Sequence, residues 1–458
     1  MAQRMNHPSR PAGTETNLRP FGNWLSVPAG TSRRRFLKTV AAAVAAPLVV
    51  PSRVLGKDGA VAPSERITMG FVGIGGQGGG HLFGGAWTYV EGGYLGRDEI
   101  QVQAVCDIWR QKREAAKERV NKRYAAKTAQ ESYKSCEAYA DFRDVLARPD
   151  IDAVLFGTPV HWHSLMSLMA AKAGKDVYCE KPVSLTIREG RAMAEAVQRY
   201  GRVYQAGTQQ RSCYGGKFRK ACEYVRSGRI GQLKAVYAML DGGGFTPGPG
   251  PTGKGQPVPK DLDWELFLGP APWTPYAGHC DAHMFGWGSI NWGQHHYDIV
   301  QWGIGSDDTG PIEIGREDGK LTYKYANGVV VYGCPYPGEK VGGTGGCTFV
   351  GTEGRIAVDR ENLVSYPSKI LQQPLGYSDV HLYKSDSHAD NFLDCVRTRK
   401  RAICDAETGH RAMSVLLLGG IAQQLNRTLK WDPQRERFIN DPEADRMLSV
   451  AMREPWHL

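Results

Sequence analysis

Short apolar segments alternate with helix-patterned segments in the first half of this chain. Five apolar runs of three to six residues have the length and composition of buried strands. Helix-patterned stretches separate them, and strands that alternate with helices build a parallel sheet covered by helices on both faces. The pattern predicts a doubly wound α/β domain. The runs are Ile67–Val72, Val102–Cys106, Ile151–Phe156, Val177–Cys179 and Val203–Gly207.

Two helices of this domain are indicated by patterning and end signals. The segment Ala138–Leu146 has helical patterning. Thr186 and Glu189 have the spacing of a capping box, in which side chains satisfy backbone amides at the start of a helix. Gly201 stands where a left-handed residue commonly ends a helix. We expect one helix over 138–146 and a second between Thr186 and Gly201.

The second half of the chain has the pattern of an antiparallel sheet. Asn327 and Gly328, the residue pair of a type I′ hairpin turn, separate two strand-like segments, Leu321–Ala326 and Val329–Tyr332. A chain of 458 residues is also too long for one ordinary core. We expect two folded domains, 67–210 and 211–458. Further short strands are expected at Leu233–Leu240, Pro311–Ile314 and Cys347–Val350.

Residues 1–66 have the pattern of an export signal and linker. A basic segment, Ser32–Lys38, precedes the Ala- and Val-rich segment Thr39–Val50. The paired arginines resemble a twin-arginine signal, which a receptor reads as an address. The apolar segment is shorter than the roughly 20 residues that span a bilayer as a helix. We expect a periplasmic or secreted protein, exported folded and without a membrane span.

The formal charge of +10 is concentrated in this leader. Residues 1–66 contain ten basic and three acidic residues, a net charge of +7, which leaves +3 for the rest of the chain. Proteins that bind nucleic acid carry a basic patch on the folded domain. The charge distribution therefore does not support a nucleic-acid partner.

A glycine-rich turn directly follows the first predicted strand and has the spacing of a dinucleotide-binding motif. The first glycine allows a tight turn, the second lets the backbone approach a pyrophosphate, and the third permits close helix packing. The next helix then directs its N-terminus toward the phosphates. A glycine-rich loop without a ligand is the alternative that the motif alone leaves open. The motif consists of Gly73, Ile74, Gly75, Gly76, Gln77 and Gly78.

Asp107 ends the second predicted strand and supports the dinucleotide interpretation. A carboxylate there accepts hydrogen bonds from the ribose hydroxyls and repels a 2′-phosphate, so we expect NAD, with NADP less favoured. Arg110 would partly accommodate that phosphate. Asp107 lies 29 residues after Gly78, where the usual spacing is about 20. We expect Gly84–Gly96 to be a loop inserted before or within the first helix, and a candidate lid.

Several motifs together resemble the Gfo/Idh/MocA family of oxidoreductases. Thr158, Pro159 and His163 follow the third predicted strand, and Glu180-Lys181-Pro182 follows the fourth. The resemblance runs from about Ile67 to the C-terminus and is similar to the secreted branch with twin-arginine leaders. It implies a Rossmann domain followed by an α+β domain built on an open, mostly antiparallel sheet. It also implies that Thr158, Pro159, His163, Glu180 and Lys181 contact the cofactor. Further matching segments are Gly207–Arg211, Trp264–Trp273, His295–Asp298 and Arg401–Leu429.

Lys181 and His295 are the expected catalytic residues. Hydride transfer from a secondary alcohol requires a group that takes the hydroxyl proton and a donor that holds the oxygen. The Lys181 ammonium can donate to that oxygen, unless it only pairs with Glu180. His295 can accept the proton, with Asp298 orienting its ring, unless it is a core histidine, which is the interpretation we favour for His296.

Asn291 departs from the family pattern implied by the resemblance, which has Asp at this position. An amide cannot carry a proton, so a redox-neutral reaction stays open. In that reaction the cofactor oxidises a sugar hydroxyl transiently, elimination or hydrolysis follows, and the hydride returns. We expect Arg211, Asn291 and Asp298 to bind the substrate.

Other residue types suggest no metal site and no disulfide framework. His279 and His283 have the spacing of a metal pair, but no Glu base lies between them and the flanking residues indicate a loop. The ten cysteines contain no Cys-x-x-Cys pair, and we expect mostly buried free thiols. Tryptophan side chains either stack on a sugar ring or fill the seam between two domains. The candidates for these two roles are Trp264, Trp273, Trp287 and Trp292.

These observations predict an NAD-dependent oxidoreductase that acts on a secondary hydroxyl of a sugar, polyol or glycoside. The alternatives are a redox-neutral glycoside hydrolase or lyase and a non-catalytic ligand-binding protein. Export in the folded state predicts that NAD is inserted before export and stays bound. We also expect a homo-oligomer formed through the sheet of the second domain.

Overall fold

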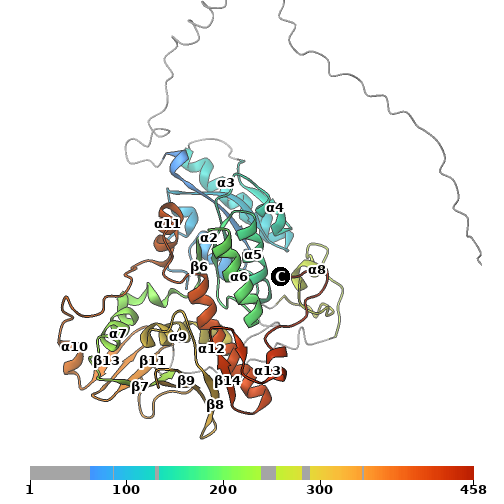
Figure 1. Ribbon diagram of the computed structural model, residues 1–458. Helices are drawn as coiled ribbons and strands as arrows, with labels where there is room; N and C mark the ends of the chain where they lie inside the picture. Colours follow the sequence, from blue (N-terminus) through green and yellow to red (C-terminus); the bar gives the residue numbers. More distant parts are fainter. Residues whose placement is uncertain (1–61, 86, 129–133, 239–253, 281–288, 343–344) are drawn as a thin grey trace, which may run out of the picture.

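The computed structural model describes residues 62–458 except 86, 129–133, 239–253, 281–288 and 343–344 (Figure 1). The twin-arginine segment lies outside these residues, so export stays a prediction. None of the helices in the described ranges is long and apolar enough to cross a membrane.

A six-stranded parallel sheet forms the first domain, in the order β3-β2-β1-β4-β5-β6. Because β1 lies between β2 and β4, the chain changes direction across the sheet there, at the point where such folds bind ligands. The predicted Rossmann fold is confirmed. The strands are β1 (Ile67–Val72), β2 (Ile100–Cys106), β3 (Glu137–Tyr139), β4 (Ala153–Phe156), β5 (Asp176–Cys179) and β6 (Tyr204–Ala206), and the helices are α2 (Gly76–Phe83), α3 (Arg110–Thr128), α4 (Phe142–Leu146), α5 (Val160–Lys172) and α6 (Ile187–Arg199).

The expected helix over 138–146 is wrong in its first part. Ala138 and Tyr139 belong to β3 and pair with Val105 and Cys106 of β2. The helix α4 begins only after Asp141, whose carboxylate accepts a 2.8 Å hydrogen bond from the backbone N–H of Arg143. Tertiary pairing with β2 thus overrides the local helical pattern.

The predicted ends of α6 are confirmed. The hydroxyl of Thr186 accepts a hydrogen bond from the Glu189 N–H at 3.2 Å. The Glu189 carboxylate reaches back to the N–H of Leu185, one residue before the expected partner. Gly201 follows the helix with a φ of +60°.

The glycine-rich segment 84–96 follows the first helix instead of preceding or interrupting it. Helix α2 ends at Phe83, and Gly84 has a φ of +85°. A Cβ atom on Gly93 would lie 2.4 Å from the backbone nitrogen of Gly84, so the two ends of the loop approach too closely for other residues. The insertion therefore lengthens the connection between α2 and β2.

A nine-stranded sheet forms the second domain, in the order β13-β12-β11-β7-β10-β9-β8-β14-β15. All neighbours are antiparallel except β7 and β10, so the predicted mostly antiparallel sheet is confirmed. Its strands are β7 (Leu233–Ala238), β8 (Glu313–Glu317), β9 (Lys320–Lys324), β10 (Val330–Tyr332), β11 (Cys347–Gly351), β12 (Arg355–Val358), β13 (Leu363–Tyr366), β14 (Leu429–Asp432) and β15 (Arg437–Phe438).

The predicted hairpin forms, but its turn is not type I′. β9 and β10 pair as expected, with Tyr323 opposite Val331. A type I′ turn needs a positive φ at both central residues, whereas Gly328 has a φ of +84° and Asn327 does not have a positive φ. The N–H of Gly328 donates to the Tyr325 carbonyl, and Tyr325 donates to Val329. This is the longer hairpin loop, in which one left-handed glycine closes the turn.

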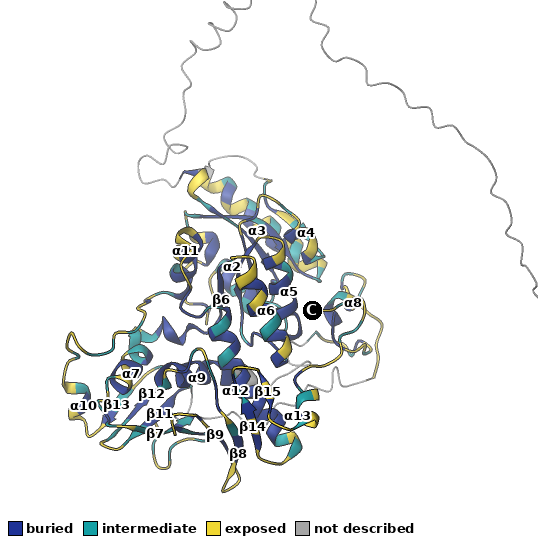
Figure 2. Cartoon of the chain, in the orientation of Figure 1, coloured by how far each residue is buried: buried dark blue, intermediate teal, exposed yellow. Residues whose placement is uncertain are grey.

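Helices α9 (Ser289–Ile304) and α12 (Ala406–Leu425) lie against each other between the two sheets (Figure 1). Most residues of α12 are buried (Figure 2), and α12 also packs against α6 of the first domain. This position brings one end of α9 to the ligand-binding edge of the Rossmann sheet. The remaining helices are α7 (Lys217–Arg226), α8 (Trp264–Leu268), α10 (Lys369–Gln372), α11 (His388–Thr398) and α13 (Pro442–Arg446).

Helix α11 crosses the domain boundary that we expected at residue 210. Its apolar face, with Phe392 fully buried, packs into the same core cluster as Phe71 of β1 and Tyr178 of β5. The amphipathic pattern of 388–398 shows that one face is buried but not which domain receives it.

Candidate cofactor and substrate site

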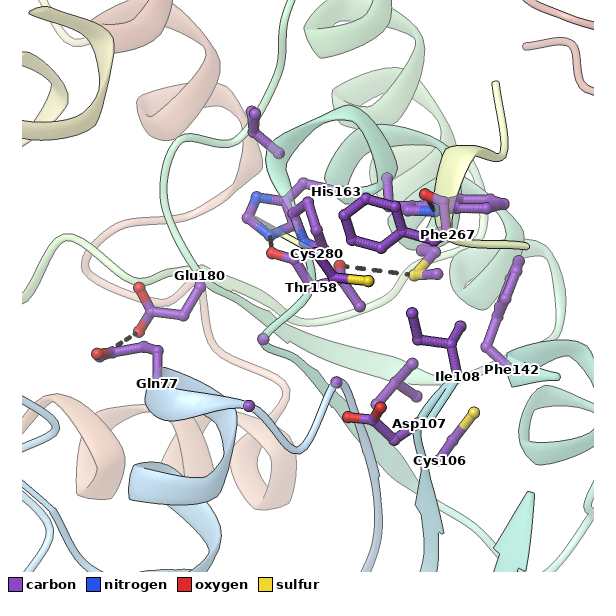
Figure 3. Close-up of a pocket in the computed structure, with 18 of the residues that line it drawn as sticks. Gln77, Cys106, Asp107, Ile108, Phe142, Thr158, His163, Glu180, Phe267 and Cys280 are labelled. Atoms are coloured by element: carbon purple, nitrogen blue, oxygen red, sulfur yellow. Dashed lines mark hydrogen bonds between the residues drawn. The ribbon is translucent and has the colours of Figure 1, made fainter. Parts of the chain in front are cut away.

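A cavity of about 420 Å³ opens at the carboxyl ends of β1, β2, β4 and β5. The glycine-rich turn, Asp107, the loop that contains Thr158 and Pro159, and the Glu180-Lys181 segment all line it. Glu180 lies beside Gln77 at one end, and Asp107 lies at the other (Figure 3). These predicted cofactor residues therefore meet in one cavity. Another wall is apolar and consists of residues that the sequence analysis did not single out, namely Ile108, Phe142, Trp162, Met166 and Phe267.

The glycine-rich turn leaves room for a ligand on one side only. Gly73 has a φ of +82°, and a Cβ there would lie 2.8 Å from the Gly157 carbonyl oxygen. A Cβ on Gly78 would collide with the Gly73 carbonyl oxygen at 1.8 Å. In contrast, Cβ atoms on Gly75 and Gly76 would meet nothing within 4 Å, and both residues line the cavity. This surface, at the N-terminus of α2, fits the pyrophosphate of a dinucleotide.

Asp107 holds the turn while facing the cavity. Its Oδ2 accepts a 2.7 Å hydrogen bond from the Ile74 N–H, and its Oδ1 accepts one of 2.9 Å from the Trp109 N–H. A carboxylate has about four acceptor sites, so two remain for ribose hydroxyls. Burial raises the pKa of Asp107 above its usual range, although both N–H bonds act to lower it.

Lys112, and not Arg110, is the cationic side chain that lines the cavity beside Asp107. Our expectation that Arg110 would approach a 2′-phosphate is therefore wrong. Both residues lie near the start of α3, where a helical rotation of about 100° per residue places neighbours on different faces.

The loop from Thr158 to His163 is fixed to the Glu180-Lys181-Pro182 segment. The two ring nitrogens of His163 lie 2.6 Å from the Pro182 carbonyl oxygen and 2.7 Å from that of Thr158. Burial lowers the pKa of His163, whereas both carbonyl contacts act to raise it. The ring lies between the two loops and connects them through whichever nitrogen carries the proton. Thr158, Pro159 and His163 all line the cavity.

Glu180 is buried at this end of the cavity and has four hydrogen-bond donors around it. Nε2 of His81 lies 2.6 Å from its Oε1, and the side-chain amides of Gln77 and Gln209 both donate at 3.3 Å. Burial alone would raise the pKa of Glu180, but the hydrogen bond and charge of His81 hold it below its usual value. The carboxylate is therefore an internal anchor, and its fourth donor is the backbone N–H of Lys181.

Lys181 lines the cavity, and His295, on α9 of the second domain, is near enough for the charge of Lys181 to act on it. Burial lowers the pKa of the Lys181 ammonium, and Glu180 opposes this effect. Burial also holds the pKa of His295 well below its usual value, and the positive charge of Lys181 is the next cause. Nδ1 of His295 is buried and has no hydrogen-bond partner among the described residues. A neutral imidazole beside an ammonium suits proton transfer.

Gln294 joins the helix that carries His295 to the loop that carries Lys181. Its Oε1 accepts a 3.0 Å hydrogen bond from the Val183 N–H, while its Nε2 donates to the Gly409 carbonyl of α12 at 3.1 Å. The side chain is fully buried. Gln294 thus sets the position of α9 relative to the cofactor loop, and no local sequence signal marks it.

Arg211 and Asp298 differ from our expectation. The guanidinium of Arg211 binds Asp298 at 2.9 Å and Asp307 at 2.8 and 2.9 Å, and it is 2% exposed. Asp298 is fully buried and faces Arg211, not the ring of His295. Both side chains are committed to an internal ion pair and do not line the cavity, so direct substrate binding by them is not supported. Asn291 lies in α9, one turn before His295, but its side chain is outside the described part of the chain.

The remaining sequence expectations concern cysteines, tryptophans and a possible metal pair, and only some of these residues are described. All ten cysteines are free thiols, and most are buried. Trp264 is buried against Phe267, whereas Trp273 is exposed and Trp287 is outside the described residues. Within the described ranges no cluster of His, Cys, Asp and Glu side chains could hold a metal ion, and the segment from Asp281 to His283 lies outside them.

Known proteins match both halves of the chain. A family model described as "Oxidoreductase family, NAD-binding Rossmann fold" matches residues 67–208, and one described as "Oxidoreductase family, C-terminal alpha/beta domain" matches residues 250–458. Among curated proteins, an alpha-N-acetylgalactosaminidase of Shewanella oneidensis is 27% identical over 223 residues. That match spans 44% of this chain and only 44% of the relative.

Solved structures share the fold over most of the chain at low sequence identity. An aldose-aldose oxidoreductase from Caulobacter crescentus has a TM-score of 0.52 and 17% identity, covering 80% of this chain and 99% of that one. The WlbA dehydrogenase from Bordetella pertussis, solved with NADH and UDP-GlcNAcA, has a TM-score of 0.51 and 16% identity, with coverage of 80% and 99%. With the glycine-rich turn, the Glu180-Lys181 loop and the two-sheet architecture in place, these matches show that the chain belongs to the Gfo/Idh/MocA family of oxidoreductases.

Proposed function

We propose that this protein is an NAD-dependent oxidoreductase that acts on a secondary hydroxyl of a sugar, polyol or glycoside. The observation that carries the proposal is that Lys181 lines the dinucleotide cavity and its charge acts on the nearby His295, with the pKa of each lowered by burial. NAD, when bound, supplies the hydride acceptor. The two protein groups supply the proton chemistry that must accompany hydride transfer.

His295 accepts the proton of the substrate hydroxyl in this scheme. Its neutral ring is available at neutral pH because burial and nearby positive charge disfavour the imidazolium. Lys181 donates a hydrogen bond to the same oxygen and stabilises the negative charge that develops there. Glu180 lies one residue away, and its hydrogen bond from His81 keeps this anchor ionised below Lys181.

The test is a panel of sugars and polyols added to the full chain with its cofactor, monitored by the absorbance of NADH. Lys181→Met and His295→Gln should each lower turnover by about 10²-fold, the usual contribution of an acid–base group, while dinucleotide binding is retained. Lys172→Met changes an exposed lysine at the end of α5 and serves as the control. Normal turnover in either site variant would remove that residue from the mechanism, and no turnover with any substrate would favour a ligand-binding protein.

A redox-neutral glycoside hydrolase or lyase is the second candidate. It is supported by the partial similarity to an alpha-N-acetylgalactosaminidase and by Asn291, an amide where proton relay would use a carboxylate. Such an enzyme would release product from a glycoside without net formation of NADH. Product analysis of nitrophenyl glycosides, with and without bound NAD, separates the two reactions.

We infer that NAD is preferred over NADP, that the protein works outside the cytoplasm, and that it forms a homo-oligomer. The preference is supported by Asp107 in the cavity. Export is supported by the twin-arginine pattern of residues 32–38. Oligomerisation is supported by an aromatic surface on the second sheet, where the rings of Tyr237 and Tyr332 stack at 4.8 Å and Tyr336 packs edge-on. Cofactor titration, cell fractionation and light scattering test the three inferences.

A further inference from the structure

Arg360, which follows β12, lies among three aromatic rings that come from distant parts of the chain. Its guanidinium carbon is 4.7 Å from the ring centre of Trp292, 5.2 Å from that of Tyr214 and 5.9 Å from that of Trp87. Trp87 belongs to the loop after α2, Tyr214 to the segment after β6, and Trp292 to α9. We call these three rings and the guanidinium the Arg360 cage.

The Arg360 cage adjoins the catalytic groups. Nε of Arg360 donates to Oε1 of Gln210 at 3.2 Å, and the amide nitrogen of Gln210 donates to the His295 carbonyl at 3.1 Å. The ring of Trp292 is 6.1 Å from the ring of His295. The charge of Arg360 also contributes to lowering the pKa of both Lys181 and His295, after the larger effects of burial and, for His295, of Lys181.

No carboxylate of the described residues lies within ion-pair distance of Arg360. Two other partly or fully buried arginines form ion pairs with carboxylates. Arg211 binds Asp298 and Asp307, and Arg191 binds Glu407 and Glu436. Within the described ranges the guanidinium of Arg360 is hydrogen-bonded through Nε to Gln210, and its two terminal nitrogens face no acceptor in those ranges, so they suit an acceptor on a ligand. The catalytic edge therefore carries two cations, Lys181 and Arg360, beside a neutral His295.

The rings of the cage offer an apolar surface to a sugar. Trp87 is 61% exposed, and Tyr89 of the same loop is 44% exposed. The hydroxyl of Tyr89 is hydrogen-bonded to that of Tyr214, which fixes the loop to the cage. Aromatic faces pack against the C–H groups of a sugar ring, and a guanidinium fork matches the two oxygens of a carboxylate.

We propose that Arg360 binds a carboxylate on the substrate, so that this enzyme takes a sugar acid in preference to a neutral sugar. The proposal rests on the proposed oxidoreductase function and narrows its substrate class. Arg360 and the cage hold the acid end, while Lys181 and His295 act on a hydroxyl. The carboxylate itself is unchanged: the hydride leaves the carbinol carbon for NAD, the hydroxyl proton goes to His295, and a carbonyl forms.

The experiment compares matched pairs of ligands on the full chain loaded with NADH. Glucose is paired with glucuronate and galactose with galacturonate, and calorimetry measures the dissociation constants. We expect the acid of at least one pair to bind about tenfold or more tightly than its neutral partner, the contribution of a charge-assisted hydrogen bond. Glucose 6-phosphate and glucose 6-sulfate are included, and tighter binding of either than of every acid would overturn the carboxylate assignment.

Three variants complete the test. Arg360→Met should remove the preference for the acid, because it weakens binding of the acid far more than binding of the neutral partner, while NADH stays bound. Arg360→Lys should keep part of the preference for the acid, because the positive charge remains while the paired donors of the guanidinium are lost. Arg435→Met removes a side chain that is 80% exposed at the far edge of the second sheet and controls for net charge. An unchanged preference in Arg360→Met, or equal binding of acid and neutral sugar by the unaltered protein, would overturn the proposal.

Turnover distinguishes this proposal from the function on which it rests. Acid binding that depends on Arg360, without hydride transfer to NAD, would support the carboxylate site and contradict the oxidoreductase function. Oxidation of neutral sugars as efficiently as sugar acids would support the oxidoreductase function and contradict the carboxylate site. Retention of NADH by Arg360→Met shows that the variant is folded.

Discussion

Nε2 of His81 lies 2.6 Å from Oε1 of Glu180, and both side chains are buried where α2 meets the loop after β5. The pair connects the helix that faces the dinucleotide phosphates to the segment that carries Lys181. Because Glu180 accepts this bond inside the protein, it is an ionised anchor for its neighbour.

Replacement of His81 should therefore weaken both the fold and the cofactor site. His81→Ala leaves an ionised carboxylate short of a donor, and we expect a loss of about 2–3 kcal/mol of unfolding free energy. His81→Gln, which keeps a donor, should lose less. Denaturant unfolding of the full chain with cofactor removed measures the effect.

The pH dependence of that loss follows from the lowered pKa of Glu180. A carboxyl group whose pKa is lower in the folded state than in the unfolded state stabilises the protein at pH values above its unfolded-state pKa, ordinarily 4.5. This contribution is lost as the pH falls through the folded-state pKa. The difference between His81→Ala and the unaltered protein should accordingly be full at neutral pH and shrink in acid. A difference that is constant with pH would show that His81 acts only by packing.

NAD should bind more tightly than NADP. The Asp107 carboxylate faces the cavity, and a 2′-phosphate would meet its charge, although Lys112 beside it reduces the penalty. Lys112→Met should therefore increase the preference for NAD, and Asp107→Asn should decrease it. Fluorescence titration with both dinucleotides measures the ratio. Equal affinities in the unaltered protein would contradict the assignment of Asp107.

The pH profile of turnover should have a broad neutral plateau. His295 has a pKa well below its ordinary value of 6.5, so its neutral form persists as the pH falls, and activity declines only in more acidic buffer. Lys181 has a pKa below its ordinary value of 10.5, so loss of its proton limits activity at alkaline pH. In Arg360→Met both limits should move to higher pH, because a positive charge has been removed. Unmoved limits would show that Arg360 does not act on these groups.

Gln294 is a positioning residue whose effect should be separable from folding. In Gln294→Ala the N–H of Val183 loses its acceptor, and α9 loses its link to the Lys181 loop. We expect kcat to fall by about tenfold with the affinity for NAD unchanged, since a small displacement of a catalytic group costs rate. Gln294→Glu retains the acceptor and should recover part of the rate. A fall in NAD content or in unfolding temperature that matches the loss of kcat would indicate a merely structural role.

The parts of the fold that follow from local sequence were predictable. Gly73, Gly75 and Gly78 act within one turn, and Thr186 caps its own helix, so spacing alone identifies them. The position of β3 was not predictable in this way, because Ala138 and Tyr139 become a strand through pairing with β2. Local preference is weak where a neighbouring strand offers hydrogen bonds.

The site shows the same division between local and distant causes. Lys181 and His295 were identified because each belongs to a short motif. Arg211 was misplaced because its acceptors, Asp298 and Asp307, are 87 and 96 residues away in the chain. Arg360 and His81 were missed for the opposite reason: nothing near them in sequence indicates the aromatic cage or the buried carboxylate that each one meets.

The final prediction concerns retention of the cofactor. If the chain is exported folded, NAD enters before export, and a cofactor lost outside would rarely be replaced, so we expect about one dinucleotide per chain after purification without added NAD. Persistence through many turnovers requires at least nanomolar affinity, about −12 kcal/mol. The loop 84–96 is a candidate lid, but none of its described residues lines the cavity, while Trp87 and Tyr89 lie at the Arg360 cage. We attribute retention to the apolar wall of the cavity, which includes Phe142, Trp162 and Phe267. Phe267→Ala should therefore lower the dinucleotide content, counted by chromatography after denaturation, whereas Trp87→Ala should leave it unchanged. A content near zero in the unaltered protein, with activity restored only by added NAD, would identify an ordinary enzyme with a dissociable cofactor.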